Sequence, residues 1–457
     1  MGETHADERP LAFEDLAAWF GEGAKPPEDF RVGAEHEKFV FRVGSHEPVA
    51  YEGPDGIHAL LQGLTQFGWK PTWESAEGGG EVIIGLSRGA ANISLEPGGQ
   101  FELSGAPLHT MHDICDETSE HLVEVKSLAA KLGLGFLGLG YTPLWRRDQV
   151  PVMPKGRYKI MRRYMPLVGG MGLDMMFRTC TVQANLDFAS EADMVAKMRV
   201  SLALQPIVTA LFANSPFIEG KPSGLLSARA QVWTDTDADR TGMLQFVFDE
   251  GFGYAAYARW ALKAPMYFVK RDGRYIDVAG RSFSDFIEGK LPEREGDRAT
   301  LNDWADHCST LFPEVRLKQY LEMRGADAGP TSRLCALPAL WAGILYDPAA
   351  QAAAWDLCRG WTAEDRAGLI RDVPRLALGA SVSGRLVRDV ARDMVAIARE
   401  GLKRRNRLSG GMIDESSYLR ELEEIAGAGR TAAERLLDFY HGAWGGEVSP
   451  VFETCAY

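Results

Sequence analysis

Alternation of polar and hydrophobic residues predicts strands over much of the first three quarters of the chain. In residues 94–105, SLEPGGQFELSG, the polar Gln100, Glu102 and Ser104 alternate with Phe101 and Leu103 after a Pro-Gly-Gly break. The predicted strands lie at 32–42, in two parts of 81–97, and at 101–105, 135–143, 175–188 and 314–327, with a hairpin at 264–278.

Helical periodicity predicts a first helix at residues 10–21 and a second from Thr110 to Gly133, where Thr110 and Asp113 form a capping pair. A long helix should begin at Ser190 and be kinked by Pro206. After about residue 335 the pattern is mainly helical. The segment 150–166 is predicted to be a basic loop bounded by proline and glycine.

This order of elements clusters strands together instead of alternating strand and helix, which favours an α+β fold with a mainly antiparallel sheet. Helices should cover one face of that sheet. Residues 1–457 are predicted to form one catalytic domain, in which 335–457 is a helical layer packed on the sheet.

Composition narrows the possible ligands. The net charge of −13 over 457 residues argues against nonspecific binding to nucleic acid or acidic membranes, so an anionic ligand would need local basic groups or metal ions. The six cysteines show no paired metal spacing and are interpreted as packing residues in a reducing compartment. The acidic N-terminus lacks an apolar run, and no stretch approaches a membrane span, so we expect a cytoplasmic protein.

Acidic residues recur on one side of the predicted strands. Glu35 and Glu37 share a strand side, with Cα atoms about 6.6 Å apart, and Glu96 and Glu102 flank the Pro-Gly-Gly break. Carboxylates gathered in a cleft need cations, and Mg²⁺ prefers such oxygen ligands. The same pattern also fits the solvated face of an ordinary antiparallel sheet, and the residues alone leave both interpretations open.

Basic and amide residues alternate on other strands. In 314–327, Arg316, Lys318, Tyr320, Glu322 and Arg324 share one side, so carboxylate and guanidinium groups alternate as a metal–phosphate site requires. Gln183 and Asn185 share a side of another strand and could orient a ligand without adding charge. Strict alternation places Arg178 on the opposite side, so a role for Arg178 requires a bulge or a strand end. From the residues alone, a magnesium–nucleotide site and the solvated face of an ordinary sheet both stay open.

Six motifs closely resemble the plant-type glutamate–cysteine ligases of plants and many proteobacteria: GAEHEKF, ISLEPGGQFELSGAP, GRYKIMRRYMP, GLDMMFRTCTVQANLDF, WTDTDADRTGML and FPEVRLKQYLEMRGAD. The resemblance extends from about residue 30 to the terminal VFETCAY. It implies a glutamine-synthetase-like domain, in which a curved antiparallel sheet forms a funnel for ATP. It also implies ATP-dependent joining of L-glutamate to L-cysteine through a γ-glutamyl phosphate, the first step of glutathione synthesis. The absence of a transit segment suggests a bacterial enzyme.

The resemblance also implies roles for single residues. The metal ligands would be Glu35, Glu37, Glu96, Glu102 and Glu322, with Mg²⁺ as the cofactor. Arg324 and the metal ligand Glu322 would be the catalytic residues. Arg324 would stabilise charge on the transferring phosphoryl group. Substrate or nucleotide contacts are expected from Gln183, Asn185, Arg178, Arg229, Trp233, Arg240, Arg316, Lys155, Arg157 and Lys159, of which the last three would belong to a cover loop.

One departure from the plant pattern concerns regulation. Asp277 and Glu293 stand where plant relatives carry a regulatory cysteine pair, so we expect an enzyme that does not need oxidation of that pair for activity. Two alternatives remain: a related carboxylate–amine ligase with another amine, and a non-catalytic nucleotide-binding regulator. The sequence leaves open the oligomeric state, the number of metal ions, substrate affinities, feedback by glutathione, which arginine holds the glutamate carboxylate and any redox control by the remaining cysteines.

Overall fold

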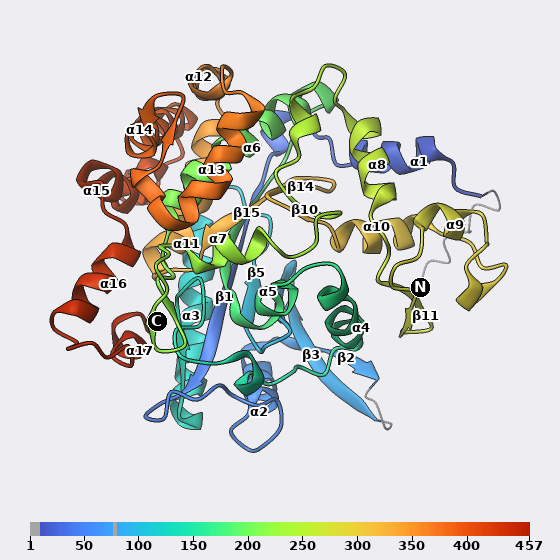
Figure 1. The fold of residues 1–457 in the computed structure, drawn as a ribbon, viewed down its shortest axis with the longest axis horizontal. Coiled ribbons are helices and arrows are strands. Elements are labelled where there is room, and N and C mark those ends of the chain that lie inside the picture. Colours follow the sequence, from blue (N-terminus) through green and yellow to red (C-terminus); the bar gives the residue numbers. More distant parts are fainter. Residues whose placement is uncertain (1–9, 76–79) are drawn as a thin grey trace.

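The centre of the computed structural model, which describes residues 10–75 and 80–457, is a nine-stranded sheet (Figure 1). Its strands follow the order β14-β15-β7-β1-β5-β4-β3-β2, with β6 paired to the far end of β1. Every pair is antiparallel. The strands are β1 (Val32–Arg42), β2 (Lys70–Ser75), β3 (Glu81–Arg88), β4 (Ala91–Leu95), β5 (Phe101–Ser104), β6 (Leu134–Leu137), β7 (Thr181–Leu186), β14 (Val315–Leu317) and β15 (Leu321–Asp327).

Helices surround this sheet, and short two-stranded ladders join them. The helices are α1 (Phe13–Gly21), α2 (Ile57–Leu64), α3 (Met111–Leu132), α4 (Gly156–Tyr164), α5 (Gly172–Arg178), α6 (Glu191–Phe212), α7 (Ala228–Trp233), α8 (Tyr254–Lys263), α9 (Phe283–Ile287), α10 (Leu301–Ser309), α11 (Thr331–Leu345), α12 (Pro348–Cys358), α13 (Ala363–Leu376), α14 (Val387–Arg405), α15 (Arg420–Ala428), α16 (Ala432–His441) and α17 (Val451–Thr454). The ladders pair β8 (Phe217–Ile218) with β9 (Lys221–Pro222), β10 (Thr241–Gly242) with β13 (Phe312–Pro313), β11 (Phe268–Arg271) with β12 (Arg274–Asp277), and β16 (Ser381–Val382) with β17 (Arg385–Leu386).

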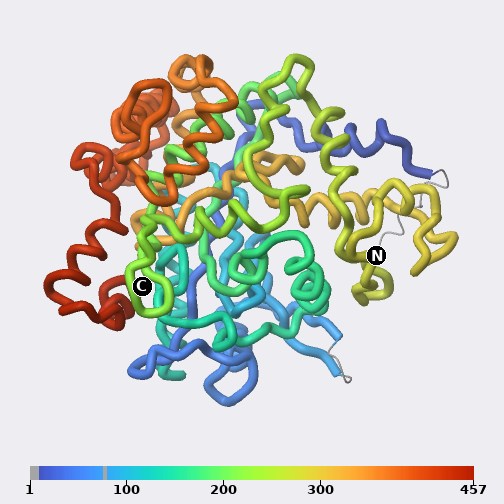
Figure 2. The backbone as a smooth tube through the Cα atoms, in the orientation of Figure 1, coloured from blue at the N-terminus to red at the C-terminus, as the bar shows by residue number. Residues whose placement is uncertain are grey.

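Two faces of the sheet have opposite character because side chains alternate along each strand. Helix α11 packs on β7 and β1, and α6 packs on β15, so that Ala34, Val182 and Ala184 lie in the hydrophobic core. In Figures 1 and 2 the C-terminal helices, coloured orange to red, gather on one side of the molecule. Within the predicted helical layer of residues 335–457, which stays a prediction, α11 contacts the sheet and α14 packs on α11. The single domain over residues 1–457 stays a prediction.

Most predicted elements are present, with corrections where local pattern and packing disagree. The segment 150–166 is not a loop throughout, since α4 occupies its second half and buries Tyr158, Ile160 and Met161 beneath its basic residues. The predicted strand 175–188 begins as helix α5 and becomes extended only at β7. The predicted strand 314–327 is a hairpin, in which Lys318 N donates to Tyr320 O between β14 and β15.

Helix α6 is the one described helix that is long and apolar enough to cross a membrane, but 83% of the relevant window is buried inside the protein. Helix α6 continues through Pro206 and supplies the centre of the larger core. The apolar composition of α6 is therefore explained by its position in the core of a globular fold.

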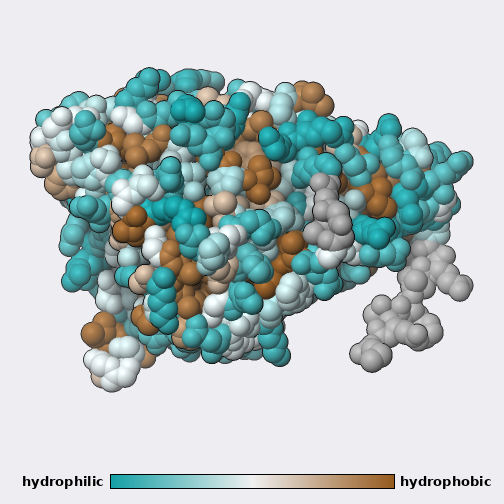
Figure 3. All heavy atoms as spheres, turned by 90° about the horizontal axis from the view of Figure 1, so that it is seen from below, coloured by the Kyte–Doolittle hydropathy of each residue, from teal (hydrophilic) through white to brown (hydrophobic). Residues whose placement is uncertain are grey.

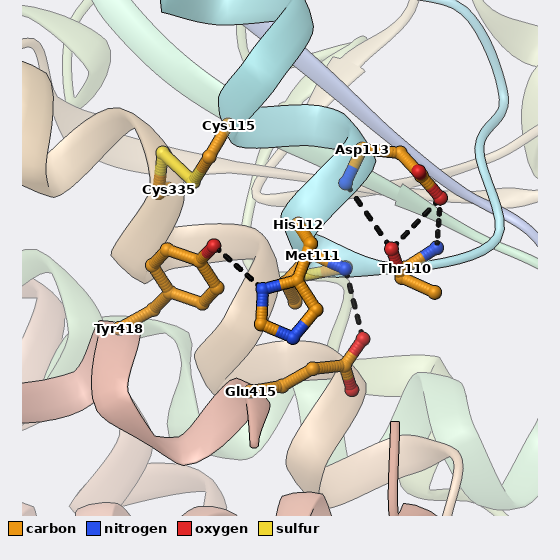
Figure 4. Close-up of a disulfide and its surroundings, with 8 residues drawn as sticks. All are labelled: Thr110, Met111, His112, Asp113, Cys115, Cys335, Glu415 and Tyr418. Atoms are coloured by element: carbon orange, nitrogen blue, oxygen red, sulfur yellow. Dashed lines mark hydrogen bonds between the residues drawn. A yellow bond between two sulfur atoms is a disulfide. The ribbon is translucent and has the colours of Figure 1, made fainter. Parts of the chain in front are cut away.

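Two cysteines correct the interpretation that all six serve only as packing residues. Cys115 on α3 and Cys335 on α11 form a disulfide with a Cα–Cα distance of 5.8 Å, although 220 residues separate them in sequence (Figure 4). Cys180, Cys308 and Cys358 are free and buried. A pairing over this distance has no local sequence signature, because it depends on how α3 and α11 pack together.

The surface carries large exposed hydrophobic residues on separate elements, for example Val123, Leu167 and Met412. On the face shown in Figure 3, hydrophobic groups are scattered among hydrophilic ones. Scattered residues of this kind are normal for a globular protein.

Candidate active site

The sheet face opposite the core lines a cavity of about 350 Å³. Strands β1, β4, β5, β7, β14 and β15 form its floor, and α4, α5 and α7 contribute to its walls. The polar lining residues are Glu35, Glu37, Ser94, Glu96, Gln100, Glu102, Ser104, Arg157, Tyr158, Thr179, Thr181, Gln183, Arg229, Ser309, Thr310, Arg316, Lys318, Tyr320, Glu322 and Arg324. Most residues that were predicted from separate stretches therefore meet in one place.

Three carboxylates converge at one end of this cavity. Glu37 on β1 lies opposite Glu102 on β5, and Ser94 on β4 donates to Glu102 Oε2 over 2.7 Å. Glu37 Oε2 accepts a hydrogen bond of 2.9 Å from Thr181 N. Glu96 enters from the turn that follows β4.

The Pro-Gly-Gly break forms the tight turn that places Glu96. Glu96 N donates to Gln100 O, Gly99 N donates back to Glu96 O, and Gly99 has a φ of 84°, a conformation that favours glycine. The Gln100 amide fixes this turn, because it accepts from Gly98 N and donates to Met176 O and Thr179 O. The break therefore holds Glu96 at the cavity wall, and Gln100 attaches this turn to the segment that contains Met176 and Thr179.

The carboxylates repel one another. Burial raises the pKa of Glu37 well above its ordinary value, and the nearby charges of Glu102 and Glu96 raise it further. Burial and Glu96 also raise the pKa of Glu102. Burial followed by the charges of Glu322 and Glu102 raises the pKa of Glu35 to about 7. This end of the cavity would be stabilised by a cation.

Amide groups from β7 hold Glu35. Asn185 Nδ2 donates to Glu35 Oε1 over 2.7 Å, and Gln183 Nε2 donates to Glu35 Oε2 over 3.2 Å. Gln183 Oε1 in turn accepts from Arg324 Nη1 over 2.6 Å. Gln183 therefore links the carboxylate end of the cavity to its basic end, while Asn185 supports Glu35 from beside it.

Glu322 differs from the other acids, because three cations engage it. Its carboxylate lies 2.6 Å from Arg316 Nε, 2.8 Å from Arg324 Nη1 and 3.3 Å from Lys318 Nζ. Burial alone would raise its pKa, but these three charges hold it well below the ordinary value. In this structure Glu322 organises a basic cluster instead of joining the other carboxylates.

Arg229 faces the cavity from α7 beside Trp233, which also lines it. Its side chain is almost fully buried, its Nη2 donates to Arg324 O over 2.8 Å, and its Nε lacks a partner among the described residues. Burial lowers the pKa of Arg229, and the charges of Asp327, Glu37 and Glu314 oppose this shift without forming an ion pair within 4 Å. A buried guanidinium in this state is well suited to an anionic ligand.

Helix α4 covers the carboxylate end. Arg157 Nη2 lies 4.0 Å from Glu96 Oε1, and Lys155 Nζ donates to Leu95 O over 3.0 Å. Tyr158 also donates to Leu95 O, over 2.5 Å. Lys159, the third predicted cover residue, lines a separate groove between α4 and the β11–β12 hairpin.

Two predicted substrate contacts need correction. Arg178 ends α5, where Asp174 and Glu219 pair with it and the Tyr141 ring covers it, away from the cavity lining. Arg240 is fully buried and bonds to Asp237 Oδ2 and Pro265 O. Arg240 is paired by protein groups, and Arg178 pairs through Nη1 alone, its Nε and Nη2 having no partner among the described residues, so it is the position of Arg178 outside the cavity lining that disfavours a substrate contact.

Apolar residues of the cavity were not predicted. Met161, Met175, Met176, Phe268 and Phe312 line one wall. Phe268 belongs to the β11–β12 hairpin and Phe312 to β13, and neither segment carries a local signal that it reaches the sheet. Lys318 and Tyr320 were predicted to share a strand side with Arg316 but were not assigned to the site; in the structure they lie in the turn between β14 and β15 and line the cavity.

The donor set is compatible with Mg²⁺. Within residues 10–75 and 80–457, no three His, Cys, Asp or Glu side chains lie close enough together to hold an ion by themselves. Magnesium commonly binds through one or two carboxylates, with waters and substrate phosphates as the other ligands. Glu37, Glu96 and Glu102 would supply one or two such carboxylates, and waters with the phosphates of a bound nucleotide would complete the coordination.

Comparison with known proteins places this geometry in a family. The family model described as glutamate–cysteine ligase family 2 (GCS2) matches residues 31–454. The chain belongs to this family. It is 55% identical over 449 residues to the chloroplastic glutamate–cysteine ligase of Nicotiana tabacum and 53% identical to that of Arabidopsis thaliana, covering 98% of this chain and 83% of each relative.

The fold agrees with this assignment. The crystal structure of glutamate–cysteine ligase from Francisella tularensis in complex with AMP superposes with a TM-score of 0.53 at 11% identity, covering 93% of this chain and 87% of the other. The expected glutamine-synthetase-like α+β fold is confirmed.

Family membership also confirms the predicted activity. As a member of the glutamate–cysteine ligase family, the chain catalyses ATP-dependent formation of γ-glutamylcysteine, the first step of glutathione synthesis. The expectation of a bacterial cytoplasmic enzyme is wrong, because the relatives that match it over nearly its whole length are chloroplast enzymes of plants.

Proposed function

We propose that the two ends of the cavity divide the ligase reaction between them. Glu37, Glu96 and Glu102 would hold Mg²⁺ at one end, and Arg316, Lys318 and Arg324 would contact the phosphates of ATP beside it. Arg229 and Trp233 would hold the α-carboxylate end of L-glutamate. The observation that carries this proposal is that buried Arg229, which forms no ion pair with a carboxylate of residues 10–75 or 80–457, faces the same cavity as a group of mutually repelling acids.

The reaction begins when an oxygen of the glutamate side-chain carboxylate attacks the γ-phosphorus of ATP. An acyl phosphate forms, and ADP leaves with the electrons of the broken phosphorus–oxygen bond. The amine of L-cysteine then attacks the acyl carbon, loses a proton, and releases inorganic phosphate. Bound Mg²⁺ would neutralise phosphate charge. Phosphoryl transfer depends chiefly on such neutralisation and on alignment of the reactants, which the side chains here can supply.

The basic cluster is oriented before substrate binds. Glu322 fixes Arg316, Lys318 and Arg324 from one side, and Gln183 accepts from Arg324 on another. Donors held in place in this way require little rearrangement as charge develops on the transferring phosphoryl group. Glu322 thus supports catalysis through the arginines, and Glu35, held by a hydrogen bond from Asn185, completes the floor between the two ends.

Steady-state kinetics of Arg229→Met test the assignment of the carboxylate subsite. Loss of a hydrogen-bonded charge costs about 1.5–3 kcal/mol, so the KM for glutamate should rise by roughly tenfold to a hundredfold while the KM for ATP changes little. Arg229→Lys should recover part of the loss, because the charge remains without the bidentate geometry. Arg392→Met, at an exposed position on α14, is the matched control.

Phosphate release with glutamate and a panel of amines tests the second substrate. Cysteine should support the fastest turnover, and preference for another amine would instead favour a related carboxylate–amine ligase. An unchanged KM for glutamate in Arg229→Met would refute the carboxylate subsite without affecting the family assignment.

A further inference from the structure

We infer that Asp327 is a positioning residue for substrate binding, which holds α7 against the end of β15 so that Arg229 faces the cavity. The inference rests on the proposed role of Arg229 in binding the glutamate α-carboxylate. Asp327 is outside the cavity lining and was not singled out by the sequence. It therefore acts through Arg229 and not on the substrate.

The carboxylate of Asp327 accepts hydrogen bonds from three donors, which lie in two loops. Its Oδ2 accepts from Ser215 Oγ over 2.7 Å and from Asn214 N over 2.8 Å. Its Oδ1 accepts from Ser227 Oγ over 2.8 Å. Both carboxylate oxygens are used, so the side chain has one defined orientation.

Ser215 and Ser227 connect Asp327 to α7 through hydrogen bonds. Ser227 is the N-cap of α7, where its Oγ accepts from Ala230 N over 3.1 Å. Ser215 Oγ accepts from Arg229 N over 3.3 Å, and Ser215 O accepts from Ala228 N over 3.0 Å. The first turn of α7, which includes Arg229, is consequently fixed to Asp327 through two hydroxyl groups.

Burial makes this arrangement specific. Asp327 is fully buried, and Ser215 and Ser227 are buried with it. A side chain at Gly140 would place its Cβ 2.3 Å from Asp327 Cγ, so the backbone at Gly140 closes directly over the carboxylate. A buried carboxylate that lost its donors would be strongly destabilised, so these hydrogen bonds resist displacement of α7.

A second attachment joins α7 to the same strand. Arg229 Nη2 donates to Arg324 O, close to the irregularity in β15 between Met323 and Ala326. Strand β15 thus carries Glu322 and Arg324 for the phosphates and Asp327 for α7. Both proposed subsites therefore depend on residues of one short strand.

Three variants test the inference: Ser215→Ala, Ser227→Ala and Asp327→Asn. Each should raise the KM for glutamate by about threefold to tenfold, as expected for losing part of a hydrogen-bonded network, with the KM for ATP and kcat changed less than twofold. Asparagine keeps the shape of Asp327 but replaces an acceptor oxygen with a donor. If Asp327→Asn fails to fold, the two serine variants decide the outcome.

Ser282→Ala is the matched control, because Ser282 is the N-cap serine of another short helix, α9, which does not line the cavity. It should lower thermal stability without changing the KM for glutamate. Adding Ser227→Ala to Arg229→Met should produce no further rise in this KM, because the group being positioned is already absent.

Two outcomes are distinguishable. If Arg229→Met raises the KM for glutamate and the three variants leave it unchanged, or raise the KM for ATP equally, the positioning role of Asp327 is wrong while the carboxylate subsite stands. If Arg229→Met itself leaves the KM for glutamate unchanged, the proposed function fails first.

Discussion

At the scale of single residues, glutamates of the same cavity lie in different electrostatic environments. Glu102 and Glu322 are both buried glutamates that line one cavity. Glu102 accepts a hydrogen bond from Ser94 beside other acids, so its pKa is raised by burial and then by Glu96. Glu322 has three cationic neighbours and a pKa held well below the ordinary value. The first environment suits a cation and the second arranges groups for an anion.

Glu102→Gln should weaken the binding of Mg²⁺ that we propose. Removing one unit charge about 4 Å from a cation, at an effective dielectric of 20, costs several kcal/mol. The Mg²⁺ concentration for half-maximal activity should therefore rise at least tenfold, while glutamine can still accept from Ser94. Activity titrations with Mg²⁺ measure this shift. Glu120→Gln, exposed on α3, should leave the midpoint unchanged, and an unchanged midpoint in Glu102→Gln would exclude Glu102 as a ligand.

At the scale of elements, helices distant in sequence are joined by contacts that no local pattern reveals. Helix α3 meets α11 through the Cys115–Cys335 disulfide, and the Met111 backbone N–H at the start of α3 donates to Glu415 (Figure 4). His112 Nδ1 and the Tyr418 hydroxyl form a further hydrogen bond of 2.8 Å. These contacts attach the C-terminal helical layer to the helix that precedes β6. The absence of oxidative control through Asp277 and Glu293, which instead pair with Arg163 and Arg281, stays a prediction.

Reduction of the Cys115–Cys335 disulfide should destabilise the folded chain. Opening a loop of 220 residues releases chain entropy in the unfolded state worth up to about 5 kcal/mol in the loop-closure model. Denaturant unfolding with and without a thiol reductant should show a lower midpoint in reductant. The double variant Cys115→Ser/Cys335→Ser should show no dependence on reductant. Equal midpoints for the unmodified chain under both conditions would contradict a stabilising disulfide.

At the scale of the whole molecule, buried neutral histidines connect stability to pH. Burial lowers the pKa of His307 to about 4, and burial lowers the pKa of His36 and His121 well below the ordinary value. As pH falls below about 6.5, the unfolded chain binds protons that the folded chain does not. The folded state therefore loses stability as pH falls from about 6.5 toward 4.

The variant His307→Gln should reduce this acid sensitivity. With a pKa of about 4 in the folded state, His307 accounts for up to about 3 kcal/mol of the loss between pH 6.5 and pH 4. Chemical unfolding at several pH values across that range gives the slope of the free energy of unfolding against pH. This slope should be smaller for His307→Gln than for the unmodified chain. His441→Gln removes an exposed histidine and serves as the control. Identical slopes for both variants would contradict the assignment.

The sequence by itself determined the alternating strands, the helix starts at Thr110 and Ser190, and the placement of Glu35 and Glu37 on one side of their strand, because alternation and capping depend on neighbouring residues. Only the tertiary structure decided which groups meet there. It brought Arg229 from α7, surrounded Glu322 with cations, paired Cys115 with Cys335 and directed Arg178 and Arg240 to structural partners. Partners of this kind are selected by long-range packing, which a local pattern of hydrophobic and polar residues does not encode.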